Sequence, residues 1–338
     1  YQTNGQVTKD LGRGMVYRNI VLRLQAQPTL TAANNLTDGV QRGDAWGVVK
    51  LIEIMANNNQ VIRSLSGNQL WWLNYFMFGT VPPVDPTLGN YDGAAGTANP
   101  ASDVCLVLPF WMFRSVRPLD TALDSRKLSD LKIRVTWGTF TDIHDDASAW
   151  TAEPTLEVHS LESANVKGPF SLQTVYSMSK TITADESKFQ VFLPTGDVYR
   201  AFLINTTDAG VDEGDIMKNL KIKSGTTVFY DAPGKVIQQA DGWMYPGIVH
   251  PIGNLLNTAG AGPLEGTTYG IYNKLQRSDS SNQAGWYFVD LVTDGYLSDA
   301  IDTLGFSEFY LELDVAVGAG TTKIDILPIQ ITPVRGKS

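Results

Sequence analysis

Apolar and polar residues alternate along much of the chain. They do so over residues 131–135 (LKIRV) and again over residues 311–314 (LELD). A period of two residues is typical of a strand in a sheet that buries one face. With apolar runs of strand length added, we expect strands at VYRNIVLRLQA, GVVKLIEIMA, NQVIRSL, LWWLNYFMF, VCLVLPFWMF, LKIRVTW and TLEVHSL, and then at VYRAFLIN, LKIKSG, TTVFYD, KVIQQA, WYFVDLV, FYLELDVAV and KIDILPIQITPV. The pattern predicts an all-β protein.

One stretch in each half breaks this alternation. Leu119, Ala122 and Leu123 stand at helical spacing, and residues 297–301 repeat that spacing. Each half is therefore predicted to hold one short helix among many strands, as in a jelly-roll β-sandwich. We expect two tandem eight-stranded jelly rolls, a double jelly roll, the first at residues 1–168 and the second at residues 169–338.

The two halves also repeat each other in sequence. The Gly-x-Val-Tyr-Arg pattern of residues 14–18 recurs at 196–200, and Leu119–Val135 aligns without gaps to Leu297–Leu313. Further matches in the same order are Asn35-Thr37-Asp38 with Asn205-Thr207-Asp208, Gly43-Asp44 with Gly214-Asp215, and Trp72 with Trp243. One such match could be chance, but five in order indicate that one fold has been duplicated.

Two long segments rich in Gly, Pro and small residues interrupt the strands at equivalent places. They span residues 79–103 and 246–284, each after the repeated tryptophan. Long loops of this kind commonly carry function. We expect both to project from the same end of the molecule as its exposed, function-bearing surface.

Length and charge narrow the possible functions. The 338 residues exceed the roughly 250–300 at which one hydrophobic core stops growing, which favours two domains. The net charge is −9, with 26 basic against 35 acidic residues and no basic block, so we expect no direct nucleic-acid binding. No run approaches the roughly 20 apolar residues of a membrane-spanning helix.

The chain has a single cysteine, Cys105, and so cannot form an internal disulfide. Its apolar surroundings predict a buried, inert thiol rather than a nucleophile. The opening segment, residues 1–10, is too polar for a signal peptide. Because the sequence begins with Tyr1, we expect that preceding residues were removed by processing or omitted.

The residues needed for catalysis or metal binding do not form a recognisable pattern. Duplicated jelly rolls include bicupins, whose metal site needs two closely spaced histidines and a carboxylate. The three histidines, His144, His159 and His250, form no such set, and there is no G-x-S-x-G elbow or phosphate loop. We therefore predict no enzyme, no catalytic, cofactor-binding or metal-binding residues and no cofactor; a bicupin is disfavoured.

Three smaller motifs could suggest a binding or modification site, but each is better explained as a loop or a turn. Asp142, Asp145 and Asp146 offer carboxylates to a calcium ion, but a solvated loop is favoured and calcium binding stays open. The two Asn-x-Thr sequons, at residues 35–37 and 205–207, are better explained as Asx turns, with glycosylation left open. The adhesion tripeptide at residues 42–44 is better explained as a duplicated turn.

The tryptophans bear on one possible function, the binding of carbohydrate. Trp71, Trp72, Trp111, Trp137 and Trp243 fall within predicted strands, where core or inter-subunit packing is expected. The same side chains exposed on one surface would instead form a sugar-binding platform. A two-domain carbohydrate-binding or adhesin protein therefore stays as the alternative function.

The strongest resemblance to a known family lies in residues 106–138, LVLPFWMFRSVRPLDTALDSRKLSDLKIRVTWG. With the duplicated strand–helix–strand order, this block resembles the double-jelly-roll major capsid proteins of the tectivirus–adenovirus lineage. The block looks like the corresponding strand–helix–strand block of tailless, membrane-containing bacteriophages. The compact loops look more like those of a phage or archaeal-virus member than those of the much larger animal-virus members. The resemblance spans nearly the whole chain in architecture but is specific in sequence only over this block.

The resemblance implies a structural major capsid protein whose homotrimers are pseudo-hexagonal tiles of an icosahedral virus shell. Its partners would be itself, neighbouring trimers, minor capsid and penton proteins, and an internal viral membrane. Direct contact with nucleic acid or with a host receptor is not expected. The protein would be assembled in the host cytoplasm and would reside in the virion. A trimer that assembles would separate this function from a small glycan-binding protein.

Overall fold

The computed structural model describes residues 1–30, 44–79, 82, 102–112, 115–143, 147–168, 170–244, 285–292 and 295–332. The first half contains β1 (Gln6–Asp10), β2 (Val16–Leu30), β3 (Val49–Ala56), β4 (Gln60–Leu65), α1 (Gly67–Phe78), β5 (Ser102–Pro109), β6 (Leu123–Asp124), β7 (Leu131–Trp137) and β8 (Ala147–Ser163). The strands form two facing sheets, one ordered β1-β7-β3-β4, and one in which β2 pairs with β5, β6 and β8. This is a jelly-roll sandwich.

The second half repeats this plan. It contains β9 (Leu172–Tyr176), β10 (Met178–Ile182), β11 (Glu186–Phe192), β12 (Val198–Asp208), β13 (Val211–Asp212), β14 (Met217–Ser224), β15 (Thr227–Pro233), α2 (Gly234–Met244), β16 (Trp286–Asp290), β17 (Ile301–Asp302), β18 (Tyr310–Val315) and β19 (Thr322–Thr332). One sheet is ordered β11-β18-β14-β15, and in the other β12 pairs with β16, β17 and β19. The expected double jelly roll is confirmed.

The duplication extends to single hydrogen bonds at the start of β2 and β12. Gly14 and Gly196 both have a positive φ, +109° and +104°, which glycine adopts without strain. The Gly14 N–H donates to Ser125 Oγ at 3.1 Å, and the Gly196 N–H donates to Thr303 Oγ1 at 2.9 Å. The repeated Gly-x-Val-Tyr-Arg pattern therefore encodes one turn, used twice.

A buried tyrosine follows each of these turns. The Tyr17 hydroxyl donates to Gly12 O at 2.6 Å, and the Tyr199 hydroxyl donates to Pro194 O at 2.5 Å. Tyr17 is 1% exposed and Tyr199 is 0% exposed. Because a buried hydroxyl needs a hydrogen-bond partner, each one uses the backbone carbonyl five residues earlier in the chain. Both strands also carry a register shift just after the tyrosine.

The helices differ from the sequence prediction. LWWLNYFMF, expected as a strand, belongs to α1, and KVIQQA belongs to α2. The short helices expected near residues 119 and 297 are single 3-10 turns, Pro118–Thr121 and Leu297–Asp299. Two further 3-10 turns flank β6 and β8, at Ser125–Lys127 and Phe140–Asp142, and another precedes β3 at Asp44–Val48.

The strand prediction for α1 was wrong because this helix is buried on nearly every side and so shows no apolar period. Its limits are encoded locally. Ser66 and Gln69 form a reciprocal capping box at the start, and Gly79 ends the helix with φ +66°. For α2, the sequence did contain evidence of a helix that the strand prediction overlooked. Val236, Ile237 and Ala240 are apolar at a spacing that suits a helix better than a strand.

The two helices begin at equivalent glycines. A Cβ at Gly67 would lie 2.1 Å from Trp46 O, and one at Gly234 would lie 2.2 Å from Met217 O. Alignment at these glycines places Trp72 opposite Gln239 in the second helix. The match of Trp72 with Trp243 was therefore wrong by one helical turn.

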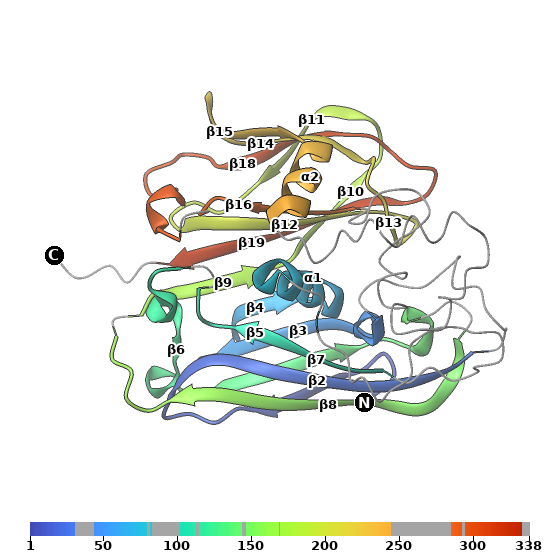
Figure 1. Ribbon diagram of the computed structural model, residues 1–338, viewed down its shortest axis with the longest axis vertical. Helices are drawn as coiled ribbons and strands as arrows, with labels where there is room; N and C mark the ends of the chain where they lie inside the picture. The colour runs from blue at the N-terminus through green and yellow to red at the C-terminus, as the bar shows by residue number, and fades with distance from the viewer. Residues whose placement is uncertain are drawn as a thin grey trace.

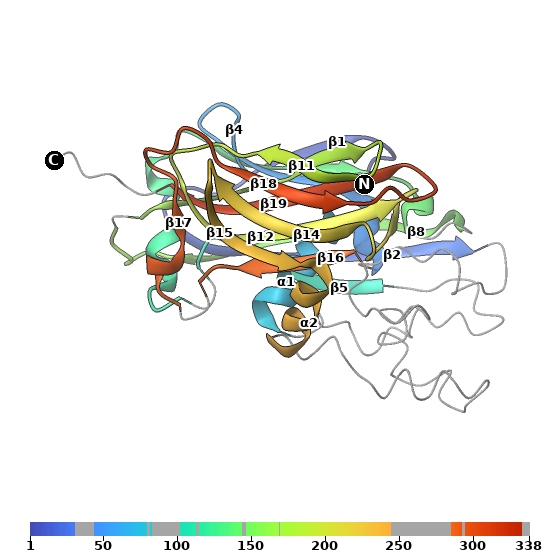
Figure 2. The same cartoon turned by 90° about the horizontal axis from the view of Figure 1, so that it is seen from above.

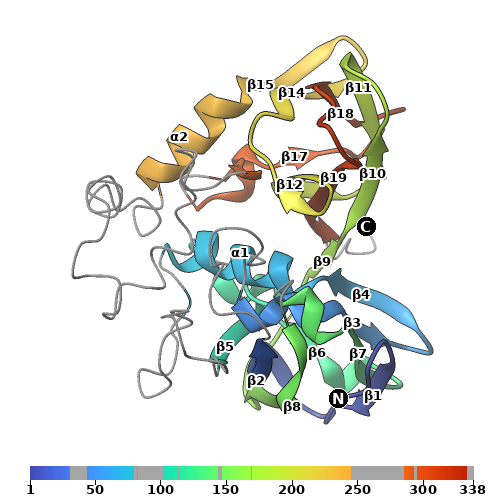
Figure 3. The ribbon, with the colours of Figure 1, turned by 90° about the vertical axis from the view of Figure 1, so that its right-hand side faces the viewer.

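The halves are stacked along the long axis of the molecule (Figure 1). Seen along that axis, the strands of both halves have roughly aligned directions (Figure 2). β9 joins the halves into one continuous sheet, because it pairs in parallel with β4 and antiparallel with β19. α1 lies between the halves, and α2 lies on the same side of the second half (Figure 3). The boundary between residues 168 and 169 stays a prediction.

Candidate assembly surfaces

Stacked aromatic rings connect α1 to the second half. Trp72 stacks on Trp286 of β16 with ring centroids 5.3 Å apart, and Phe76 stacks on Phe288 with centroids 5.0 Å apart. None of the four is more than 3% exposed. Such ring pairs contribute about 0.5–1.5 kcal/mol each beyond the burial of their area. The contact is therefore a packed interior rather than a surface on which two domains slide.

The sheet face that packs on the hydrophobic core around α1 is apolar. The residues of β12 and β19 that belong to the same hydrophobic cluster as the core of the first half are Ala201, Leu203, Leu327 and Ile329. Sequence analysis did not identify this junction, although a signal was present: residues 286–289 read WYFV, an unbroken apolar run. Such a run indicates a strand buried on both faces.

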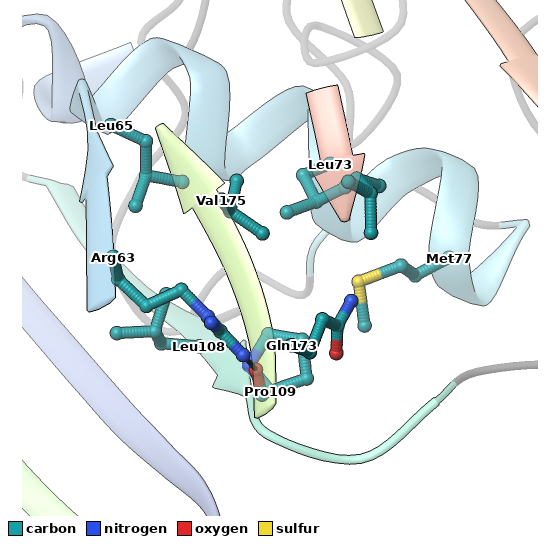
Figure 4. Close-up of a pocket in the computed structure, with 9 residues that line it drawn as sticks. Arg63, Leu65, Leu73, Met77, Leu108, Pro109, Gln173 and Val175 are labelled. Atoms are coloured by element: carbon teal, nitrogen blue, oxygen red, sulfur yellow. Dashed lines mark hydrogen bonds between the residues drawn. The ribbon is translucent and has the colours of Figure 1, made fainter. Parts of the chain in front are cut away.

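A small cavity lies at one side of this junction (Figure 4). Its volume is about 10 Å³, at most room for one water molecule. Arg63 lines it, is 1% exposed, and donates to Ile62 O at 2.9 Å and to Pro109 O at 3.4 Å. Its guanidinium lies 5.1 Å from the Phe110 ring centroid. The cavity is too small for a substrate.

Burial lowers the pKa of the Arg63 guanidinium to about 9, so the group is still charged at pH 7. No carboxylate in the described ranges forms an ion pair with it. Carbonyl oxygens and the Phe110 ring therefore solvate this charge. Nothing in the sequence distinguished Arg63 from a surface arginine of an alternating strand.

A larger polar cleft of about 550 Å³ opens where the N-terminus of α1 meets the ends of β12 and β19. Its lining includes Gln69, Asn205, Asp212, Lys323 and Asp325. Trp286 also reaches it, but its indole N–H donates to Asp212 at 2.9 Å and the residue is only 3% exposed. The described residues that line this cleft form no open aromatic platform for a sugar ring.

The other tryptophans are mostly interior. Trp71, Trp72 and Trp137 are buried and Trp111 is half-buried. The expectation of packing is confirmed for these four, and the side chain of Trp243 lies outside the described part of the chain.

The candidate reactive side chains lie on the outer face of β2, β5 and β8. Cys105 is half-buried rather than buried, and burial, followed by the charge of Asp103, raises the pKa of its thiol. His159 is exposed, and its Nε2 lies 3.1 Å from Glu157 Oε2. Cys105 pairs across the sheet with Arg23, whereas His159 pairs with Val21, so they occupy different cross-strand rows. A thiol of raised pKa without an adjacent base is not an activated nucleophile.

The acidic loop is described only in part. Asp142 forms an ion pair with Lys50. His144, Asp145, Asp146 and His250 lie outside the described residues, as do Asn35, Thr37, Asp38, the tripeptide through Gly43 and nearly all of the loops 79–103 and 246–284. Within the described ranges no three His, Cys, Asp or Glu side chains gather as metal ligands. None of the described helices combines the length and apolarity needed to cross a bilayer.

Several solved structures with the same chain fold are viral capsid proteins. The crystal structure of the STIV MCP matches with a TM-score of 0.67 at 12% identity, over 98% of this chain and 92% of that one. The major capsid protein P2 of bacteriophage PM2 matches at 0.58 and 11%, over 100% and 94%. PBCV-1 VP54 matches at 0.57 and 12%, over 97% and 90%.

No protein-family model and no curated protein sequence matches the chain. At these identities the structural likeness establishes fold rather than function. The chain has the double-jelly-roll fold of major capsid proteins, as the sequence resemblance implied.

Proposed function

We propose that this chain is a structural major capsid protein whose homotrimers form pseudo-hexagonal tiles of an icosahedral virus shell. The observation that carries the proposal is the paired architecture: two sandwiches of identical strand order, joined by a shared core and a continuous sheet. Three such chains present six similar wedges, which suits a six-fold lattice position. The likeness to capsid proteins over nearly the full length of both chains supports this choice.

The proposed role needs no catalysis and no cofactor. Its partners are neighbouring trimers, minor capsid and penton proteins, and an internal viral membrane, and its location is the virion. The net charge of −9 argues against direct genome binding. The loops 79–103 and 246–284 remain the proposed outward surface. The carbohydrate-binding alternative is weakened because no described tryptophan forms an exposed platform.

The mass of the purified protein in solution tests the proposal. Multi-angle light scattering should give three chains of 37.0 kDa, about 111 kDa. Electron microscopy of the same sample should show six-lobed tiles or closed shells. A stable 37.0 kDa monomer that binds glycans would refute the capsid function and support the alternative.

A further inference from the structure

The two helices hold equivalent positions but have unequal surroundings. Asn74 of α1 accepts the N–H of Val107 in β5 at 2.7 Å, and Asp241 of α2 accepts the N–H of Phe288 in β16 at 2.9 Å. Asn74 and Asp241 each lie seven residues after the glycine that begins the helix. Each helix is thus fastened to the same edge of its own sandwich. Within the part of the chain that the structure describes, only α1 is then covered by another sheet.

Most of the described side chains on the outward face of α2 are exposed and uncharged, and the exposed Lys235, which pairs with Asp215, lies at the edge of this face. Val236 is 51% and Met244 is 44% exposed, and Gln239 and Ala240 between them are also exposed. These positions follow the helical period and so lie on one side of α2. Their counterparts on α1 are all at most 6% exposed, because the second half covers them: Gln69, Trp72, Leu73 and Met77.

The sheet of the second half that covers α1 is equivalent to a sheet of the first half whose outer face is exposed. In the second half, Ala201 pairs with Ile329, and in the first half Asn19 pairs with Leu161 at the equivalent position. Ile329 is 0% exposed whereas Leu161 is 52% exposed.

The next cross-strand row behaves in the same way. Leu203 and Leu327 are buried, whereas Val21 is half-buried and the side chain of His159 is 63% exposed. The outer face of β2, β5 and β8 in the first half is therefore equivalent to the outer face of β12, β16 and β19 in the second half. The face in the second half is covered by α1. The face in the first half carries Leu161 and Val21, which no residue in the described part of the chain fully covers.

We propose that α2 of one copy docks on the outer face of β2, β5 and β8 of a second copy and thereby reproduces the internal junction between copies. Met77 and Ile329 line the same cavity in the internal junction, so Met244 of one copy should meet Leu161 of the next. The two surfaces belong to different halves: α2 lies on the side of the upper half in Figure 1, and β2 and β8 lie at the lower end. The contact is consequently head-to-tail, and a rotation that closes it generates a ring. The inference rests on the proposed trimer and assigns its contact surfaces.

Two exposed residues, one from each surface, allow a test without disturbing the core. Leu161→Glu and Met244→Glu are each expected to shift the mass from about 111 kDa to the 37.0 kDa of the monomer, with an unchanged circular dichroism spectrum. Leu304→Glu is the matched control, because this leucine is 56% exposed in the turn after β17, outside both surfaces. It should leave the trimer intact.

Mixing the two variants provides the decisive measurement. Each retains one intact surface, so an equimolar mixture should form a two-chain species of about 74 kDa, twice 37.0 kDa, that cannot close into a ring. Leu161→Lys combined with Met244→Glu in one chain should restore the trimer by charge pairing.

The outcomes separate this inference from the proposed function. A monomeric wild-type protein would overturn both. A trimeric wild type whose Leu161→Glu and Met244→Glu variants stay trimeric would overturn the inference alone. The inference alone would also be overturned if the Leu161→Glu and Met244→Glu variants remained monomeric when mixed. The same conclusion would follow if these single variants lost their fold and the double variant, Leu161→Lys with Met244→Glu, gave no trimer.

Discussion

Asp241 in α2 occupies the position of Asn74 in α1, and this difference predicts a stabilising substitution. The Asn74 amide donates to Leu70 O at 2.8 Å and to Val107 O at 2.7 Å, and it accepts the Val107 N–H. The Asp241 carboxylate, 4% exposed, accepts the Phe288 N–H but has no proton to donate when ionised. Asp241→Asn should therefore supply two hydrogen bonds that α1 already has.

The pH dependence follows from the pKa of this carboxyl. Burial raises the pKa of Asp241 well above its ordinary value. The hydrogen bond from the Phe288 N–H lowers this pKa by less than burial raises it, and the charge of Asp290 raises it slightly further. The folded state thus binds this proton more tightly than the unfolded state does. The protonated Asp241 carboxyl makes its full contribution to the free energy of unfolding below its unfolded-state pKa of about 3.9. This contribution is lost as the pH rises through the pKa of Asp241 in the folded state.

At pH 7 we expect Asp241→Asn to raise the free energy of unfolding by about 2 kcal/mol, from two hydrogen bonds of about 1 kcal/mol each. At pH 4 the gain should shrink, because a protonated carboxyl donates one bond itself. Urea unfolding at both pH values and at one fixed protein concentration measures the difference.

The reciprocal variant, Asn74→Asp, serves as the control and should lose stability at pH 7 more than at pH 4. A loss of stability in Asp241→Asn at pH 7, or a gain of equal size at pH 4, would refute this reasoning.

Two further substitutions test the packing of the duplicated helices. Gly67→Ala should destabilise by about 1–3 kcal/mol, because the new Cβ would overlap Trp46 O; an unchanged melting temperature would contradict the tight contact. Trp72→Ala should cost about 3–5 kcal/mol by removing the stack on Trp286. Calorimetry of this variant should show the halves beginning to unfold separately, and a single unshifted transition would count against a shared core.

The sequence by itself determined much of the plan of each sandwich. Alternation identified strands such as β7, whose burial pattern follows it residue by residue. The Gly-x-Val-Tyr-Arg repeat identified the duplication, because a left-handed glycine turn followed by a self-satisfied tyrosine is a local arrangement that a short motif can encode. The missed helix α1 also had local signals in Ser66, Gln69 and Gly79.

Only the tertiary structure decided how the halves meet. A uniformly apolar segment has no period, so its conformation depends on what surrounds it, and α1 is a helix covered by the sheet of the other half. The sequence likewise could not show that Arg63 is buried while Leu161 is exposed. Burial is a property of neighbours brought together by folding, and for a duplicated chain it differs between two copies of the same element.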